Sequence, residues 1–169
     1  MPLVVETGQI IEGADSYVSL VDARELAAKF NMALPLDDDE AEAALRNGAL
    51  YIDLQEPAMC GRRVSPEQSL AFPRTGIRLF GFDVSRTTIP SQVIRAQVIA
   101  AVEYGNGTDV RASSDGRATS MERVEGAVTV QYFDNGTNGS TTTITAAMDA
   151  LRPLLCGSNN GSSFNVYRG

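Results

Sequence analysis

The N-terminal part of the chain begins with an extended segment and continues into a helix. Residues 1–18 contain short apolar runs broken by glycines, which indicates an extended conformation. Apolar side chains then recur at helical spacing over residues 20–30. Ser19 precedes this stripe and Asp22 follows three residues later, as in a capping box with an acid in the first turn. A helix is therefore predicted to begin at Ser19 and to end within residues 31–35.

A second helix is predicted to follow Asp37, a candidate N-cap with Glu40 three residues later. The acidic run 37–40 lacks the alternating ligands and central glycine of a calcium loop, so it indicates a solvated helix start. One face of this helix consists mostly of small side chains, which would let a partner helix approach closely. That face comprises Ala41, Ala44, Leu45, Gly48, Ala49 and Ile52.

The next region is a long segment without periodicity, followed by the most apolar helix of the chain. Residues 57–89 are predicted to be irregular, and loops of this length in a small domain are usually functional or mobile. Pro90 suits the first position of a helix, and Gly105 suits the position just past its end. Because apolar residues cover more than one face of this helix, we expect it to be the most buried.

The last third of the chain is more polar. An exposed connection leads to the alternating stretch "MERVEGAVTVQYFD", which predicts a β-hairpin or strand arm near residues 121–134. A short helix is predicted in "TITAAMDALRPLL", with Pro153 kinking or stopping it. We therefore predict a mainly α fold, a bundle of about four helices over residues 1–156, with an extended, flexible C-terminal tail at 157–169.

Composition and charge narrow the functional classes. A chain of 169 residues can bury a full core without a metal or disulfide. Its net charge of −7 argues against binding nucleic acid through phosphates, and no apolar stretch is long enough to cross a membrane. The basic residues are 13 arginines and one lysine, a bias that suits bidentate pairing at interfaces and also arises from a GC-rich genome.

The sequence carries no recognisable catalytic or metal site. It has no histidine, and therefore lacks the commonest general base and metal ligand. The two cysteines, Cys60 and Cys156, are far apart and are expected to be buried thiols, although arginines beside Cys60 would favour its thiolate. We expect no catalytic residues, no cofactor and no metal, and thus no enzyme.

The stretch "GRRVSPEQSLAFPRTGIRLFGFD", residues 61–83, concentrates arginines, prolines and apolar side chains. It could line an anion-binding site, or be pinned to the core by its apolar side chains while the arginines form salt bridges, or dock onto another protein. The interface interpretation is favoured. Its candidate subunit-interface residues are Arg62, Arg63, Phe72, Pro73 and Arg74.

Three stretches in this order, "GADSYVSLVDA", "EAALRNGALYIDL" and "GRRVSPEQSLAFPRTGI", with the Ile89–Pro90 helix start after them, carry a family resemblance. The chain resembles the head–tail adaptor (connector, head-completion) proteins of tailed bacteriophages. Phe72 stands where that family usually has Trp. Some related sequences are labelled DnaT-like single-stranded-DNA-binding proteins. The polar inserts at 106–120 and 134–143 depart from the pattern and leave the placement of the strand arm open.

The resemblance implies a structural virion protein of the head–tail junction, made in the host cytoplasm. Its copies would form a ring, usually a dodecamer, that binds the portal protein and a tail-side protein: a stopper, tail terminator or tail tube. Genomic double-stranded DNA would pass through the lumen without specific binding, and no membrane is involved. By this resemblance the tail would anchor to the portal through Phe164, Val166, Tyr167 and Arg168.

A single-stranded nucleic-acid-binding module is the alternative. Such a module needs a basic groove with aromatic side chains on which bases stack. The absence of Trp and the net negative charge count against it.

Overall fold

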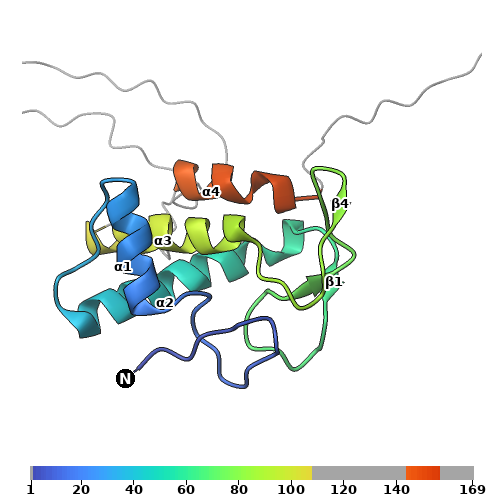
Figure 1. Cartoon of the computed structure of the whole chain (residues 1–169), viewed down its shortest axis with the longest axis horizontal. Coiled ribbons are helices and arrows are strands. Elements are labelled where there is room, and N and C mark those ends of the chain that lie inside the picture. The colour runs from blue at the N-terminus through green and yellow to red at the C-terminus, as the bar shows by residue number, and fades with distance from the viewer. Residues whose placement is uncertain (1, 108–143, 157–169) are drawn as a thin grey trace, which may run out of the picture.

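The computed structural model describes residues 2–107 and 144–156, which form a bundle of four α-helices. Helix α3 (Ser91–Gly105) lies at the centre, between α2 (Asp38–Leu54) and α4 (Thr145–Leu151) (Figure 1). Helix α1 (Leu20–Lys29) packs across α2 and α3. The mainly α class is thereby confirmed. Within the described ranges, no helix has the length and apolarity that a bilayer crossing requires.

The helix starts follow the local sequence signals. The Ser19 hydroxyl accepts a hydrogen bond from the Asp22 amide at 3.1 Å, and Asp37 Oδ1 accepts one from the Glu40 amide at 3.0 Å. Both predicted caps are confirmed. At α3 the prediction is wrong by one residue at each end, because Pro90 is the N-cap and Gly105 is the last helical residue.

The small-residue face of α2 meets α3 at very short range, as predicted. A Cβ at Gly48 would lie 2.4 Å from the backbone oxygen of Gln97, so only glycine fits there. The Gln97 side chain is fully buried, and its amide nitrogen donates to Ser16 Oγ at 2.8 Å and to Leu45 O at 2.9 Å. Its amide oxygen accepts from the Tyr17 amide at 2.9 Å. Gln97 thus joins α3, α2 and the N-terminal segment, a connection that the sequence did not indicate.

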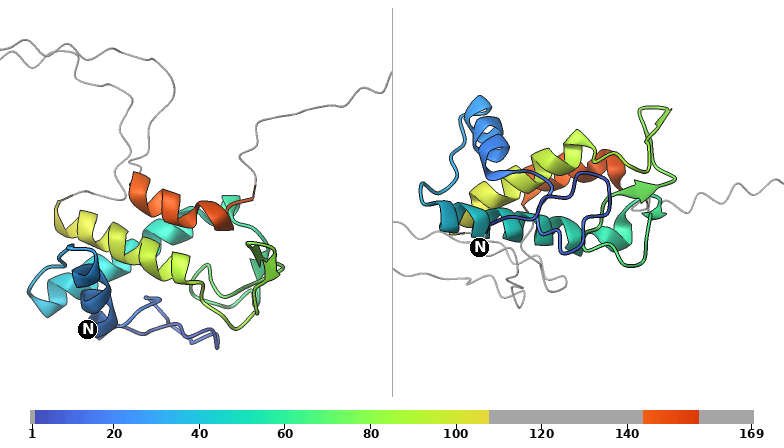
Figure 2. Two further views of the ribbon diagram at one scale, coloured as in Figure 1. Left: turned by 45° about the horizontal axis from the view of Figure 1, so that its top comes forward. Right: turned by 60° about the horizontal axis from the view of Figure 1, so that its bottom comes forward.

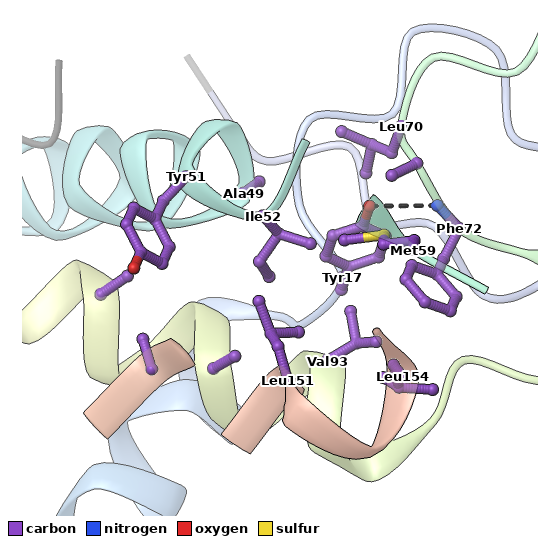
Figure 3. Packing of buried hydrophobic residues seen from close by; sticks show 14 of the residues in the cluster. Tyr17, Ala49, Tyr51, Ile52, Met59, Leu70, Phe72, Val93, Leu151 and Leu154 are labelled. Carbon is purple, nitrogen blue, oxygen red and sulfur yellow. Dashed lines mark hydrogen bonds between the residues drawn. The ribbon is translucent and has the colours of Figure 1, made fainter. Parts of the chain in front are cut away.

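The larger of two hydrophobic clusters lies between the C-terminal half of α2, α3, α4 and the loop that follows α2 (Figure 3). The Tyr51 hydroxyl donates to Ile144 O at 3.3 Å and accepts from Ile144 N at 3.2 Å, which fixes the chain entering α4. Burial raises the pKa of Tyr51, so its hydroxyl remains a donor. Other members of the cluster include Tyr17, Ile52, Met59, Leu70, Phe72, Val93, Leu151 and Leu154.

The segment between α2 and α3 is not wholly irregular, contrary to the prediction. It begins with a short 3-10 helix, η1 (Glu56–Ala58). Strand β1 (Arg62–Arg63) then pairs with β2 (Arg74–Thr75), and β3 (Arg78–Leu79) pairs with β4 (Phe82–Asp83), both antiparallel. Each strand is two residues long, which is too short to show a period in the sequence.

The chain after α4 returns to the end of α2. Pro153 lies in a 3-10 helix, η2 (Arg152–Leu154), which ends the helical segment as predicted. Cys60 and Cys156 form a disulfide, with their Cα atoms 4.7 Å apart, so the expectation of two thiols is wrong. The close approach follows from the fold, because Cys60 N donates to Leu154 O and Cys156 N to Ala58 O, each at 2.8 Å. The predicted strand arm at 121–134 and the tail at 157–169 lie outside the described residues.

Candidate functional site

The Glu56 carboxylate forms salt bridges with two arginines of the loop that follows α2. Its carboxylate accepts two hydrogen bonds from Arg63, at 2.7 and 2.6 Å, in a bidentate pair. Arg74 Nη1 donates to the same carboxylate at 3.0 Å. The bonds from Arg63 are the main reason that the pKa of Glu56 lies below its ordinary value. Both arginines are therefore paired within the subunit, and the one carboxylate offsets one of their two positive charges.

Arg74 is a buried structural arginine, with a relative exposure of only 5%. Its guanidinium donates to three backbone oxygens, those of Cys60 at 2.9 Å, Gly61 at 3.1 Å and Ala71 at 3.3 Å. It also lies 6.0 Å from the centre of the Phe72 ring, within cation–π range. Arg74 thus holds residues 60–61 against residues 71–74 within the loop.

The Tyr17 hydroxyl and the Asp53 carboxylate hold residues 71–72 of the loop. The Tyr17 hydroxyl donates to Asp53 Oδ1 at 3.1 Å, and the Ala71 amide donates to the same oxygen at 2.8 Å. The Phe72 amide donates in turn to the Tyr17 hydroxyl at 3.2 Å (Figure 3). Burial raises the pKa of both Tyr17 and Asp53, in the case of Tyr17 well above its ordinary value.

The buried side chain of Gln68 forms hydrogen bonds with four backbone groups of the loop. Its amide oxygen accepts from the backbone nitrogens of Val64 at 3.0 Å and Ser65 at 3.1 Å. Its amide nitrogen donates to Leu70 O at 2.8 Å and Pro73 O at 3.0 Å. With the contacts of Tyr17, Asp53, Glu56, Arg63 and Arg74, these bonds form what we call the loop brace.

The loop brace decides how much surface the predicted interface residues offer. Phe72, Pro73 and Arg74 are buried inside the subunit, and Arg63 is bound to Glu56, whereas Arg62 is exposed. A direct subunit contact stays a prediction for these residues, and burial leaves the first three almost no surface for it. The predicted portal anchor, Phe164, Val166, Tyr167 and Arg168, lies outside the described residues.

The exposed feature of this region is the β3–β4 hairpin, which the sequence analysis did not predict. Phe80 and Phe82 are 78% and 77% exposed. The two-residue turn consists of Phe80, with a φ of 52°, and Gly81, with a φ of 90°, as a type I′ turn requires. Arg78 closes the hairpin by pairing with Asp83 at 3.2 Å and by donating to Gly81 O at 2.9 Å.

The base of this hairpin is anchored although its tip is exposed. Ile77, immediately before it, is buried, and Leu79 packs against the main hydrophobic cluster. The Val84 amide donates to Ile77 O at 3.0 Å. The hairpin therefore presents two aromatic rings from a fixed base; the one signal for it in the sequence is a glycine inside the apolar run "RLFGFD".

An open groove of about 790 Å³ lies between the N-terminal segment, α1 and the chain that enters α3. Its apolar lining includes Leu26 and Ile94, both half-buried. Two exposed carboxylates, Asp22 and Glu25, and the ammonium group of Lys29 complete this side of the groove. We call this feature the α1 groove.

Neither feature has the ligands of a metal centre. Over residues 2–107 and 144–156, no cluster of three or more His, Cys, Asp or Glu side chains is placed to hold a metal ion. Comparison with curated proteins and with solved structures found no match for this chain. One family model, described as "Putative DnaT-like ssDNA binding protein", matches residues 1–169, and the chain belongs to that family.

Proposed function

We propose that the chain is a structural virion protein, a head-to-tail adaptor whose copies form a ring under the portal. The observation that carries this proposal is the exposed Phe80–Phe82 pair on a hairpin with an anchored base. Aromatic side chains that stand out from a rigid element are typical anchors of protein–protein interfaces. The resemblance of the ordered motifs to phage adaptor proteins supports the same function.

The charge of the chain suits this role. With a net charge of −7, a ring of copies would repel the phosphates of DNA moving through its lumen rather than hold them. The ring would extend the DNA channel of the portal and give a tail-side protein its docking surface. No catalytic step is part of this function, and no membrane takes part in it.

Binding of single-stranded nucleic acid is the second candidate, and the same hairpin favours it. Bases stack on exposed aromatic rings, and Arg78 in the hairpin and Arg86 three residues after β4 would contact phosphates. The family description also names single-stranded-DNA binding. The overall negative charge works against this activity, because phosphate binding depends on clustered basic residues.

Two measurements separate the candidates. Purified protein is mixed with the portal of its virion, and the complex is imaged by negative-stain microscopy; the adaptor function predicts rings on the portal. In parallel, fluorescence anisotropy of labelled oligothymidine is followed at 50 and 200 mM salt. Salt-dependent binding to oligothymidine, with no ring on the portal, would replace the adaptor function with the alternative.

A further inference from the structure

We propose that the β3–β4 hairpin of one copy docks into the α1 groove of the next copy, an inference that rests on the proposed adaptor function. The contact would be head to tail, because each copy carries one hairpin and one groove. A heterologous contact of this kind generates a ring when its rotation closes. In this contact the hairpin of one copy occupies the groove of its neighbour.

The turn of the hairpin points to a partner outside the subunit. Phe80 adopts a left-handed φ of 52°, a conformation that bulky side chains rarely take and that Asn, Asp or Gly would adopt at lower cost in a type I′ turn. Its ring is 78% exposed, so the described part of the chain does not compensate for this cost. Strained residues of this type concentrate at functional sites, where an external contact makes use of them.

The chemistry of the α1 groove complements that of the hairpin. Half-buried Leu26 and Ile94 would contact the two phenylalanine rings, and the volume of about 790 Å³ is within the range of pockets that enclose aromatic groups. Three carboxylates, those of Glu6, Asp22 and Glu25, and one ammonium group, that of Lys29, line the groove, which leaves a balance of −2. Residues 78–86 carry two arginines and one aspartate, which leaves a balance of +1. Opposite charges therefore meet around an apolar centre, as in specific interfaces.

The positions of the two features suit a contact between copies. The hairpin and α1 lie toward opposite ends of α3, as the labels of Figure 1 and the right-hand view of Figure 2 show. The groove extends from α1 to residues 87–89, the chain between the hairpin and α3, yet Phe80 and Phe82 are 78% and 77% exposed, so the hairpin does not fill the groove of its own subunit. Each copy would therefore offer its hairpin to one neighbour and its groove to another. A contact between two hairpins would instead be isologous and would stop at a dimer.

A mixing experiment tests the head-to-tail arrangement. The hairpin variant carries Phe80→Gly and Phe82→Ser; the groove variant carries Glu25→Arg and Thr88→Arg, two exposed positions that line the groove. Leu36→Ser, at a residue that is 97% exposed elsewhere on the surface, is the control. Circular dichroism melting first establishes that all three variants fold, and sedimentation then measures self-association of the free and the portal-bound protein.

We expect the dissociation constant for self-association of each double variant alone to rise at least about tenfold. The dissociation constant of Leu36→Ser should match that of the wild type. Mixing the two double variants should give 1:1 heterodimers of about 36 kDa, twice the subunit mass of 18.0 kDa, and nothing larger. These heterodimers form because one intact hairpin and one intact groove remain between them. Absence of heterodimers in the mixture would overturn the head-to-tail contact.

Photo-crosslinking separates this inference from the proposed function. p-Benzoylphenylalanine replaces Phe82, and cross-linked peptides are mapped by mass spectrometry with and without the portal. Cross-links to residues 22–29 or 87–94 of another copy support the docking. Cross-links to another surface of a second copy, or to the portal, overturn the docking but keep the adaptor function. A protein that forms no cross-link to another copy or to the portal, and no ring, overturns both.

Discussion

Replacing Arg63 with alanine tests whether the arginines after α2 stabilise the subunit or join subunits. The variant loses two charge-assisted bonds to Glu56, at 2.7 and 2.6 Å, and one bond to Gln68 O at 2.7 Å. A hydrogen bond to a charged partner contributes about 1.5–3 kcal/mol. Because Arg63 is one-third exposed and Glu56 keeps its bond from Arg74, we expect a total loss of about 2–3 kcal/mol.

For a domain of this size that loss lowers the melting temperature by about 4–12 °C. Urea unfolding followed by circular dichroism measures it. Arg62→Ala is the matched control, because Arg62 is adjacent and exposed and its loss should change stability by less than about 0.5 kcal/mol. If Arg63→Ala melts like the wild type but assembles poorly, the loop brace is not what stabilises this region and Arg63 is an interface residue.

Three further predictions concern the core and the pH dependence. Gln97→Leu should lower the free energy of unfolding by about 2–4 kcal/mol, measured in urea, because it leaves the Tyr17 amide without its partner; an unchanged value would mean that water replaces the amide. Gly48→Ala should cost about 1–3 kcal/mol or more in the same assay, because the added Cβ would lie 2.4 Å from a backbone oxygen of α3; wild-type stability would mean that the helices separate easily. The pKa of Glu56 is lowered, so its stabilisation is complete above about pH 4.5 and is lost as the pH falls through its folded-state pKa. Glu56→Gln should therefore reduce the loss of stability as the pH falls from 6 to 3. The raised pKa of Asp53 contributes in the opposite direction, because protonation of this carboxyl favours the folded state.

The helices were predictable because their signals are local. Ser19 and Asp37 cap α1 and α2 through bonds to residues three positions away, so a short window of sequence contains all the information. The small face of α2 also predicted its close packing, which Gly48 makes possible. The ends of α3 were misplaced by one residue, since Pro and Gly each suit two neighbouring positions at a helix end.

The loop after α2 was left with three alternatives, one of which has apolar side chains pinning it to the core while the arginines form salt bridges, and the structure shows that arrangement within the subunit. The partners of these side chains could not be read from the loop itself. Arg63 and Arg74 both form salt bridges with Glu56. The Phe72 amide donates to the hydroxyl of Tyr17, which lies 55 positions away in the chain. Sequence reasoning noted a resemblance of these stretches to phage adaptor proteins, which stays a prediction, and did not show that the stretches contact each other. The disulfide was missed for the same reason, because 96 positions separate its cysteines.

The loop brace holds residues 60–74, the chain that leads to the hairpin, through side chains from three stretches of the sequence. Tyr17 precedes α1, Asp53 lies in the last turn of α2, Glu56 begins η1, and Gln68 lies inside the loop itself. In a genetic selection for restored assembly after damage to the hairpin, compensating changes should therefore arise at positions 17, 53 and 56 as well as in the hairpin. Suppressors at such positions would show that the surface formed by the hairpin depends on residues elsewhere in the subunit.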